Sequence, residues 1–132
     1  MTVMNPELSF LSGLRRIATH PAARGLSDDA AVLEIGKRKL VLTLDTMVEG
    51  VHFLATDPPE TVAHKLLAVN LSDLAAKGAA PLGALMSYTL AGDAAWDEAF
   101  LSGLHAALGS FGVPLIGGDT VSGRERTVGM TL

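Results

Sequence analysis

The sequence predicts an α+β domain, a mixed or antiparallel sheet with helices packed on one side. Two observations favour this class. Segments with helical and with strand-like spacing follow one another in the order helix, two strands, helix, strand, helix, two strands. Glycine and proline punctuate these segments where turns are needed. With 132 residues, the chain can bury a core of its own, so we expect residues 1–132 to form a single domain.

The first half of the chain is expected to hold a helix, a loop, a hairpin and a long second helix. Their ranges are 5–17, 22–29, 32–35 paired with 39–45, and 57–77. Asn5 before Pro6 is typical of a helix start, with the asparagine as N-cap. Asp57 with Glu60 three residues later indicates a capping box for the long helix. Gly78 marks its C-terminal end.

The second half is expected to hold a strand, a helix and two further strands. Their ranges are 84–90, 93–110, 114–116 and 126–132. Trp96, Phe100, Leu104 and Leu108 recur at helical spacing and predict the buried face of that helix. We expect 114–116 to be a short buried strand followed by a loop at residues 117–120. The last strand stops without a turn, which predicts further residues after Leu132, and hence a second domain.

Composition excludes several classes of protein. The net charge of −4 argues against a nucleic-acid surface, and no apolar run approaches the ~20 residues of a membrane span. The N-terminus lacks the basic and apolar regions of a signal peptide. Without cysteine there is no disulfide, thiolate metal site or cysteine nucleophile. We therefore expect a cytoplasmic protein that binds neither nucleic acid nor membrane.

Five aspartates lie in turn-like or strand-end positions among small or apolar residues. They are Asp28, Asp29, Asp45, Asp73 and Asp119. Asp45 follows an apolar strand, where a carboxylate needs a partner for its charge. Carboxylates that converge from different elements suit Mg²⁺, a small hard cation that takes oxygen ligands and often carries phosphates as well. The sequence thus predicts a magnesium-dependent site that handles phosphate.

Each of these acids also has a structural alternative. Asp28 and Asp29 could equally cap a turn or strand. Asp73 shares a helix face with Asn70 and Lys77, so an Asp–Lys surface pair is the alternative there. Two glycines before Asp119 would let the backbone approach a phosphate, although Gly-Gly-Asp also occurs in many turns.

The histidines do not indicate a zinc site. His52 has no second histidine nearby, so zinc is disfavoured. A substrate contact and an ordinary structural role remain as alternatives for His52. The chain has neither a Walker pattern nor a dinucleotide glycine pattern, so a nucleotide site must be of another type.

These motifs, in this order, resemble the thiamine-monophosphate kinases, which belong to the ATP-binding superfamily of aminoimidazole ribonucleotide synthetase. The stretches that carry the resemblance are Asp28-Asp29-Ala30-Ala31-Val32, residues 43–53 with Glu49-Gly50-Val51-His52-Phe53, residues 65–79 with Asn70-Leu71-Ser72-Asp73-Leu74-Ala75-Ala76, and Leu115-Ile116-Gly117-Gly118-Asp119-Thr120. The resemblance implies a fold of the N-terminal-domain type of this superfamily. It also implies transfer of the γ-phosphoryl group of ATP onto thiamine phosphate, giving thiamine diphosphate.

The resemblance further implies roles for individual residues. Mg²⁺ ions on the ATP phosphates would be held by Asp29, Asp45, Asp73 and Asp119, with Thr43 assisting. Gly118 and Asp119 would contact the nucleotide, and His52 the thiamine phosphate. No residue is expected to act as a catalytic base, because a phosphate acceptor is already ionised.

Two residues depart from the family pattern. Ser27 stands where the family usually has glycine. Leu44 stands where it commonly has threonine or serine, so a metal contact there must come from the backbone. The family also has a second domain, so we expect this chain alone to be inactive.

The resemblance also implies a homodimer, and the strand at 84–90, around Met86 and Tyr88, fits an edge that needs covering. Two alternatives remain. One is another ATP-dependent synthetase or kinase of the same superfamily. The other is a non-catalytic dimerisation domain.

Overall fold

The structure, a computed structural model, describes residues 5–132. The chain divides into two compact units, one up to Leu42 and the other from Thr43 to Leu132. The first unit contains α1 (Pro6–Ile17), the 3-10 helix η1 (Pro21–Leu26), β1 (Ala30–Ile35) and β2 (Arg38–Thr43), whose last residue begins the second unit. β1 and β2 form a two-stranded sheet. A single domain over residues 1–132 stays a prediction.

The N-terminal helix begins where the sequence predicts. The Asn5 side chain accepts a hydrogen bond from the Glu7 amide at 3.0 Å, which satisfies one of the free donors of the first turn. The predicted loop at 22–29 is wrong over its first part, where η1 forms. His20 Nδ1 caps this helix by accepting from the Ala22 amide at 3.1 Å, and Pro21 has the φ that a helix start requires.

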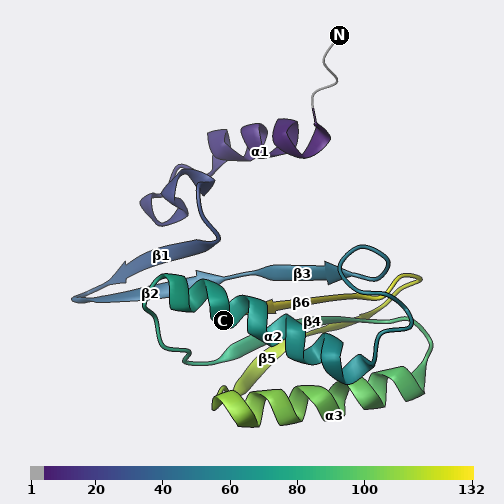
Figure 1. The fold of residues 1–132 in the computed structure, drawn as a ribbon. Coiled ribbons are helices and arrows are strands. Elements are labelled where there is room, and N and C mark those ends of the chain that lie inside the picture. The colour runs from purple at the N-terminus through teal and green to yellow at the C-terminus, as the bar shows by residue number, and fades with distance from the viewer. Residues whose placement is uncertain (1–4) are drawn as a thin grey trace. The chain divides into compact units, whose positions relative to one another are not determined.

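The second unit is a four-stranded sheet with two helices. Its elements are β3 (Asp45–Val48), α2 (Pro59–Ala76), β4 (Ala84–Leu90), α3 (Ala94–Phe111), β5 (Leu115–Ser122) and β6 (Thr127–Thr131). The strand order is β3-β6-β4-β5. β4 and β5 are parallel, whereas β6 is antiparallel to both β3 and β4. The two helices pack together on one side of the sheet (Figure 1), so the predicted α+β class with a mixed sheet is confirmed.

The core of the second unit lies between the sheet and the two helices. From the sheet it contains Met47, Tyr88, Val128 and Met130, and from the helices Val62, Leu66, Leu67, Trp96, Phe100 and Leu104. Three of the four residues predicted for the buried face of α3 are therefore buried, and Leu108 is half-buried. Among residues 5–132, no helix is both long and apolar enough to cross a bilayer.

Asp45 does not end the strand in which the sequence places it. β2 finishes at Thr43, Leu44 belongs to neither strand, and Asp45 opens β3. The reason is a change of partner: β2 pairs with β1, whereas Asp45 pairs with Met130 of β6. One continuous apolar run is thus divided between two sheets.

The predicted capping box of the long helix is also wrong. Asp57 Oδ2 accepts from the Leu54 amide at 2.8 Å, and the N-cap position is taken by Pro58, without a side-chain cap. Proline at N1, here Pro59, is already suited to a helix start because its missing N–H is not needed there. The C-terminal end is confirmed, since Gly78 has a φ of 64° after the C-cap.

The Gly-Gly-Asp segment lies within a strand. β5 runs without interruption from Leu115 to Ser122 along β4, and all eight of its residues are exposed. The expected buried strand at 114–116 and the loop at 117–120 are therefore wrong. β4 lies between β6 and β5, so the expectation that the strand at 84–90 is an edge is wrong, and the two edge strands are β3 and β5. Periodicity cannot reveal this, because a short apolar run does not show which neighbour it pairs with.

Candidate functional site

The first two predicted acids lie in the N-terminal unit, immediately before β1. Asp28 accepts from Arg24 Nε at 2.8 Å and from the Ala30 amide at 3.4 Å. These contacts are those of a residue that fixes the turn into β1. Asp29 is exposed, so its carboxylate is open to a ligand from solvent.

Asp45 and Asp119 lie in the four-stranded sheet, on different faces. Asp45, Met130, Met86 and Gly118 form one row across the four strands. Side chains of paired residues share a face, and successive residues alternate between faces. Asp45 therefore projects on the face that the helices cover, and Asp119 on the open face. Their strands, β3 and β5, lie three strand spacings apart, about 14 Å across the sheet.

Asp73 lies on α2 and is half-buried. Asn70, one turn earlier, is completely buried and joins the helix to the end of β2. Thr43 Oγ1 donates to Asn70 Oδ1 at 2.7 Å and accepts from the Leu132 amide at 3.2 Å. Asn70 Nδ2 donates to the Leu66 carbonyl at 2.9 Å. The Thr43 hydroxyl thus has a protein partner in both directions.

A cavity of about 320 Å³ lies on the open face beside Asp119. Gly118 and Asp119 of β5, Ser87 of β4 and Gly129 of β6 line it, together with the exposed Leu44. A Cβ at Gly129 would lie 2.7 Å from Ser87 Oγ. Glycine at this position therefore keeps the floor of the cavity open.

Gly118 has a structural reason to be glycine. A Cβ at this position would lie 1.9 Å from the Met86 carbonyl oxygen, and its φ is 158°. Any side chain would push β5 away from β4. This close approach leaves Asp119 at a fixed place on the open face.

His52 lies on the exposed loop between β3 and α2. Its Nδ1 accepts from the Val48 amide at 3.0 Å. The neutral imidazole that makes this bond has its proton on Nε2, which can then donate to an anionic ligand. The loop turns at Gly50, whose φ is 80°, and Gly50 N donates to the Phe53 carbonyl at 2.7 Å.

Sequence reasoning missed a buried arginine that contacts this loop. Arg126 is 7% exposed, donates from Nη1 to Glu49 Oε2 and stacks on the Trp96 ring, with Cζ 3.9 Å from the ring centroid. The sequence offers no signal for it, because Arg126 opens the predicted last strand directly after the polar residues Gly123-Arg124-Glu125, where an arginine is typically exposed.

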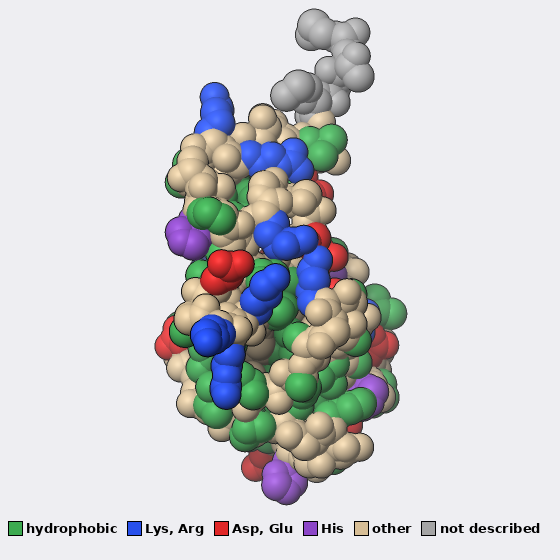
Figure 2. All heavy atoms as spheres, turned by 90° about the vertical axis from the view of Figure 1, so that its left-hand side faces the viewer, with side chains coloured by type: hydrophobic (Ala, Val, Ile, Leu, Met, Phe, Trp, Pro, Cys, Tyr) green, Lys and Arg blue, Asp and Glu red, His purple; other side chains and the backbone are tan. Residues whose placement is uncertain are grey.

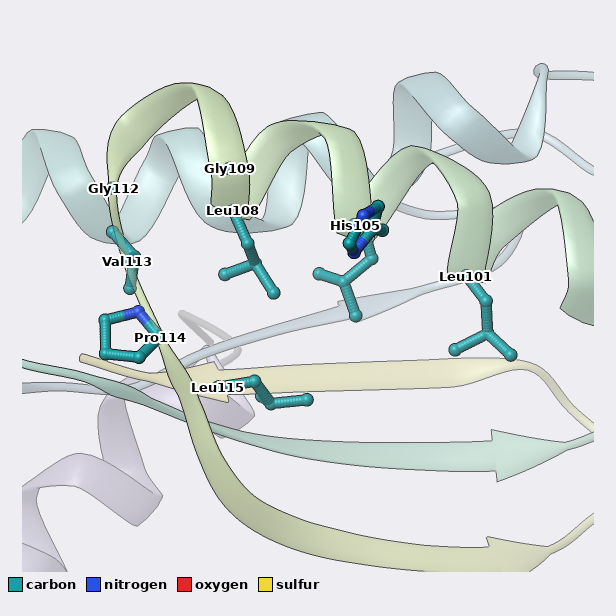
Figure 3. A pocket seen from close by; sticks show the side chains of 9 residues that line it. Leu101, His105, Leu108, Gly109, Gly112, Val113, Pro114 and Leu115 are labelled. Carbon is teal, nitrogen blue, oxygen red and sulfur yellow. The ribbon is translucent and has the colours of Figure 1, made fainter.

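A larger cavity of about 570 Å³ lies between the end of α3 and the start of β5. Figure 3 shows Leu101 and Leu108 of α3 pointing to the side of the strands, where Leu115 lies, with His105 on the same helix. Figure 2 faces this end of the second unit and shows hydrophobic side chains at its surface. None of the predicted site residues lines this cavity.

Across the described part, residues 5–132, no three histidine or acidic side chains lie close enough together to hold a metal ion. The metal-binding roles of Asp29, Thr43, Leu44, Asp45, Asp73 and Asp119 stay predictions, as do the roles of His52 and Gly118.

Comparison with known proteins identifies the family to which the chain belongs. Residues 27–132 match the family model described as AIR synthase related protein, N-terminal domain. Thiamine-monophosphate kinase of Salmonella typhimurium is 48% identical over 101 residues, which are 75% of this chain and 31% of that enzyme. The enzyme of the same name from Caulobacter vibrioides is 48% identical over 121 residues, 88% of this chain and 34% of that enzyme.

A solved structure has the same fold over almost the whole chain. It is named AaThiL complexed with AMPPCP and TMP, and it superposes with a TM-score of 0.86 at 27% sequence identity. The match covers 99% of this chain and 43% of that chain. The resemblance found in the sequence motifs is thereby confirmed. The chain spans about a third of the length of the curated relatives it matches.

Proposed function

Because this chain belongs to the AIR synthase related proteins and shares their N-terminal domain, we propose that it serves an ATP-dependent kinase that converts thiamine phosphate into thiamine diphosphate. The observation that carries the proposal is the 48% identity to enzymes named thiamine-monophosphate kinase. The fold match to a structure named with AMPPCP, an ATP analogue, and TMP supports the same pair of substrates. A cytoplasmic location goes with this proposal.

The reaction is mainly a problem of charge. The bond between the γ-phosphorus of ATP and its bridging oxygen breaks, and a bond to an oxygen of thiamine phosphate forms. Two polyanions must approach each other, so positioning and positive charge supply most of the catalysis. The attacking phosphate oxygen is already ionised, so no side chain needs to remove a proton.

Mg²⁺, when bound, supplies the positive charge that offsets the phosphates. Asp29, Asp45, Asp73 and Asp119 would hold Mg²⁺ ions, not all four the same ion, since Asp45 and Asp119 project from opposite faces of the sheet. Their carboxylate oxygens are donors that Mg²⁺ prefers, and one or two carboxylates with phosphate and water oxygens commonly complete its six positions. Because no three such side chains lie together within residues 5–132, each ion would take at most two of these carboxylates from this part of the chain, and phosphate and water oxygens would fill its other positions.

Thr43 and Leu44 would act differently from the acids. Both hydrogen bonds of the Thr43 hydroxyl go to protein atoms, on Asn70 and Leu132, so its help at the metals is to fix the chain just before Asp45. The side chain of Leu44 has no oxygen and is 69% exposed. Any contact that Leu44 makes with a metal comes from its carbonyl group.

The two anionic substrates would bind at different places: thiamine phosphate at His52, and ATP in the cavity beside Gly118 and Asp119. His52 Nε2 is suited to donate to a phosphate oxygen of thiamine phosphate, because Nδ1 already accepts from Val48. Gly118 brings its backbone to the cavity that Asp119 lines, and glycine amides can approach phosphate closely. ATP is the ligand we propose there.

A homodimer forms part of the proposal. The edge strand β5 is exposed along its whole length, and the open face of the sheet has exposed apolar side chains at Leu85 and Val121. An exposed apolar edge strand is a template for pairing with another chain. A second copy would cover the part of this face around Val121 and leave the cavity beside Asp119 to ATP.

The test is an assay of thiamine diphosphate formation from thiamine phosphate, ATP and Mg²⁺, with the full-length protein that carries this chain. Asp45→Asn should lower kcat/KM by about a hundredfold or more, because it removes several kcal/mol of charge stabilisation at the metal. Glu98→Gln, which changes an exposed acid of α3, is the matched control and should leave activity unchanged. An inactive, folded parent would overturn the kinase assignment and favour another phosphate acceptor.

A further inference from the structure

We propose that Arg126 is a positioning residue for the substrate-binding loop, acting through His52 on the affinity for the phosphate-bearing acceptor. This inference rests on the proposed function, because it takes His52 as the contact to thiamine phosphate. In this role Arg126 would not touch the substrate itself. Arg126 lies just before β6, where it contacts Glu49 of the loop of residues 48–53.

Arg126 is connected to the start of this loop twice. Its Nη1 donates to Glu49 Oε2, and its backbone carbonyl accepts from the Glu49 amide at 3.0 Å. The Arg126 side chain is 8% exposed, whereas the Glu49 side chain is 28% exposed. A partly desolvated, charge-assisted pair of this kind is stronger than an exposed surface pair.

The other end of the loop is connected to the same arginine through α3. The guanidinium lies over the Trp96 ring at 3.9 Å, and Trp96 stacks on Phe53 with ring centroids 6.1 Å apart. Phe53 is 4% exposed and forms an isolated bridge with Glu49. Arg126 therefore holds both residues that flank the turn on which His52 lies.

The ring of His52 depends on this turn. Its Nδ1 accepts from the Val48 amide, and its own amide donates to the Val48 carbonyl at 2.9 Å. If Glu49 and Phe53 move apart, Val48 moves relative to His52 and the hydrogen bond that orients the imidazole is lost. The direction in which Nε2 points to the substrate would then no longer be fixed.

The chemistry of the site selects arginine over lysine. One guanidinium donates to Glu49, lies over the Trp96 ring and comes within 3.9 Å of Asp93 Oδ2 at the start of α3. A planar fork can do all three, whereas an ammonium group is a single point. Among residues 5–132, Nε of Arg126 finds no hydrogen-bond partner, so its position is set by these contacts.

The experiment uses the full-length protein and compares Arg126→Lys with Glu49→Gln, which weakens the same pair from its more exposed side. Both should raise KM for thiamine phosphate about tenfold and leave KM for ATP within about twofold. Arg124→Lys, an exposed arginine in the same turn, is the control and should change neither constant. In a His52→Ala background, Arg126→Lys should have little further effect, because coupled residues are not additive.

Amide hydrogen exchange of residues 48–53, measured without substrate, gives a readout that does not depend on the reaction. Both variants should speed exchange there relative to the parent and to Arg124→Lys. An unchanged KM and exchange rate in both variants, or full additivity with His52→Ala, would overturn the positioning role. If the parent proves inactive with thiamine phosphate, the proposed function fails, and the exchange data alone decide whether Arg126 holds the loop.

Discussion

Thr43 and Asn70 show at the scale of single residues how polar groups are accommodated in this core. Thr43 is 2% and Asn70 0% exposed, and each uses the other as a hydrogen-bond partner. The link joins α2 to the end of the chain through the Leu132 amide. A buried polar group that loses its partner retains the full cost of its desolvation.

We therefore expect Thr43→Val to lower the free energy of unfolding by about 1–3 kcal/mol, because it leaves Asn70 Oδ1 and the Leu132 amide without the hydroxyl. Urea denaturation of the purified protein measures the change. Thr61→Val is the control: its hydroxyl bonds the Pro58 carbonyl at an exposed site, and the loss should stay within about 0.5 kcal/mol.

The double variant Thr43→Val/Asn70→Leu separates this account from a simple packing defect. Removing both polar partners costs less than the sum of the single changes. Additive losses would contradict the role of the hydrogen bond.

At the scale of elements, α2 and α3 approach each other closely where Gly103 faces Glu60. A Cβ at Gly103 would lie 2.4 Å from the Cα of Glu60, whereas a Cβ at Gly109, also in α3, would meet nothing within 4 Å. Substitution by alanine should therefore lower the free energy of unfolding at Gly103 and raise it at Gly109.

Gly103→Ala is expected to lower the free energy of unfolding by about 1–3 kcal/mol, since the backbone of α2 must move. Gly109→Ala should raise it by up to about 1 kcal/mol, because alanine favours a helix over glycine. Thermal or urea unfolding of both variants measures the difference. Equal effects at the two positions would show that the helices do not pack as described.

Tyr88 links β4 to α3, since its hydroxyl donates to Asp97 Oδ1 at 2.5 Å. Burial, and then the hydrogen bond to Asp97, raise the pKa of Tyr88 well above its usual value. In the unfolded chain this phenol ionises near pH 10. Its contribution to stability is thus complete below pH 10 and is lost as the pH rises toward the raised pKa of the folded state.

Between these two pKa values the unfolded chain binds one proton fewer at Tyr88, so stability falls by about 1.4 kcal/mol per pH unit. Tyr88→Phe should remove this contribution to the decrease of the free energy of unfolding with pH. The measurement is the free energy of unfolding of parent and variant at a series of pH values above 10. If the free energies of unfolding of parent and variant fall in parallel as the pH rises, Tyr88 is not a buried, neutral phenol in the folded protein.

The helices were predictable from the sequence, and much of the sheet was not. Asn5, Gly78 and the Trp96–Phe100–Leu104 spacing are local signals, and α1, the end of α2 and the buried face of α3 follow them. The division of an apolar run between β2 and β3, and the exposed position of β5, depend on which strands pair. Pairing is a long-range property that no local pattern of 4–8 apolar residues specifies.

At the scale of the whole molecule, the residues predicted to bind metal come from separate elements of the chain. Asp29 lies in the N-terminal unit, Asp45 and Asp119 lie on opposite faces of a sheet, and Asp73 lies on a helix. The motifs identified these residues because each is locally unusual. Arg126 was missed because its role depends on long-range contacts. Its partner Glu49 is 77 residues away in the sequence, and the ring that it covers, Trp96, belongs to α3.

The proposed homodimer gives the last prediction, which concerns the open face of the sheet. Val121 is 51% exposed there, on the edge strand β5. Val121→Lys should hardly affect the folded monomer, because the side chain stays in solvent. In a dimer that covers this face, it would bury like charges from both copies, which costs about 3 kcal/mol or more, roughly a hundredfold in Kd.

Sedimentation equilibrium of the full-length protein measures this change. Leu101→Lys is the matched control, since Leu101 is 56% exposed on α3, on the helix-covered side of the sheet. We expect the parent and Leu101→Lys to remain dimers at concentrations where Val121→Lys is a monomer. A monomeric parent, or dissociation by Leu101→Lys alone, would contradict the open face as the contact, whereas loss of the dimer in Val121→Lys alone assigns the contact to β5.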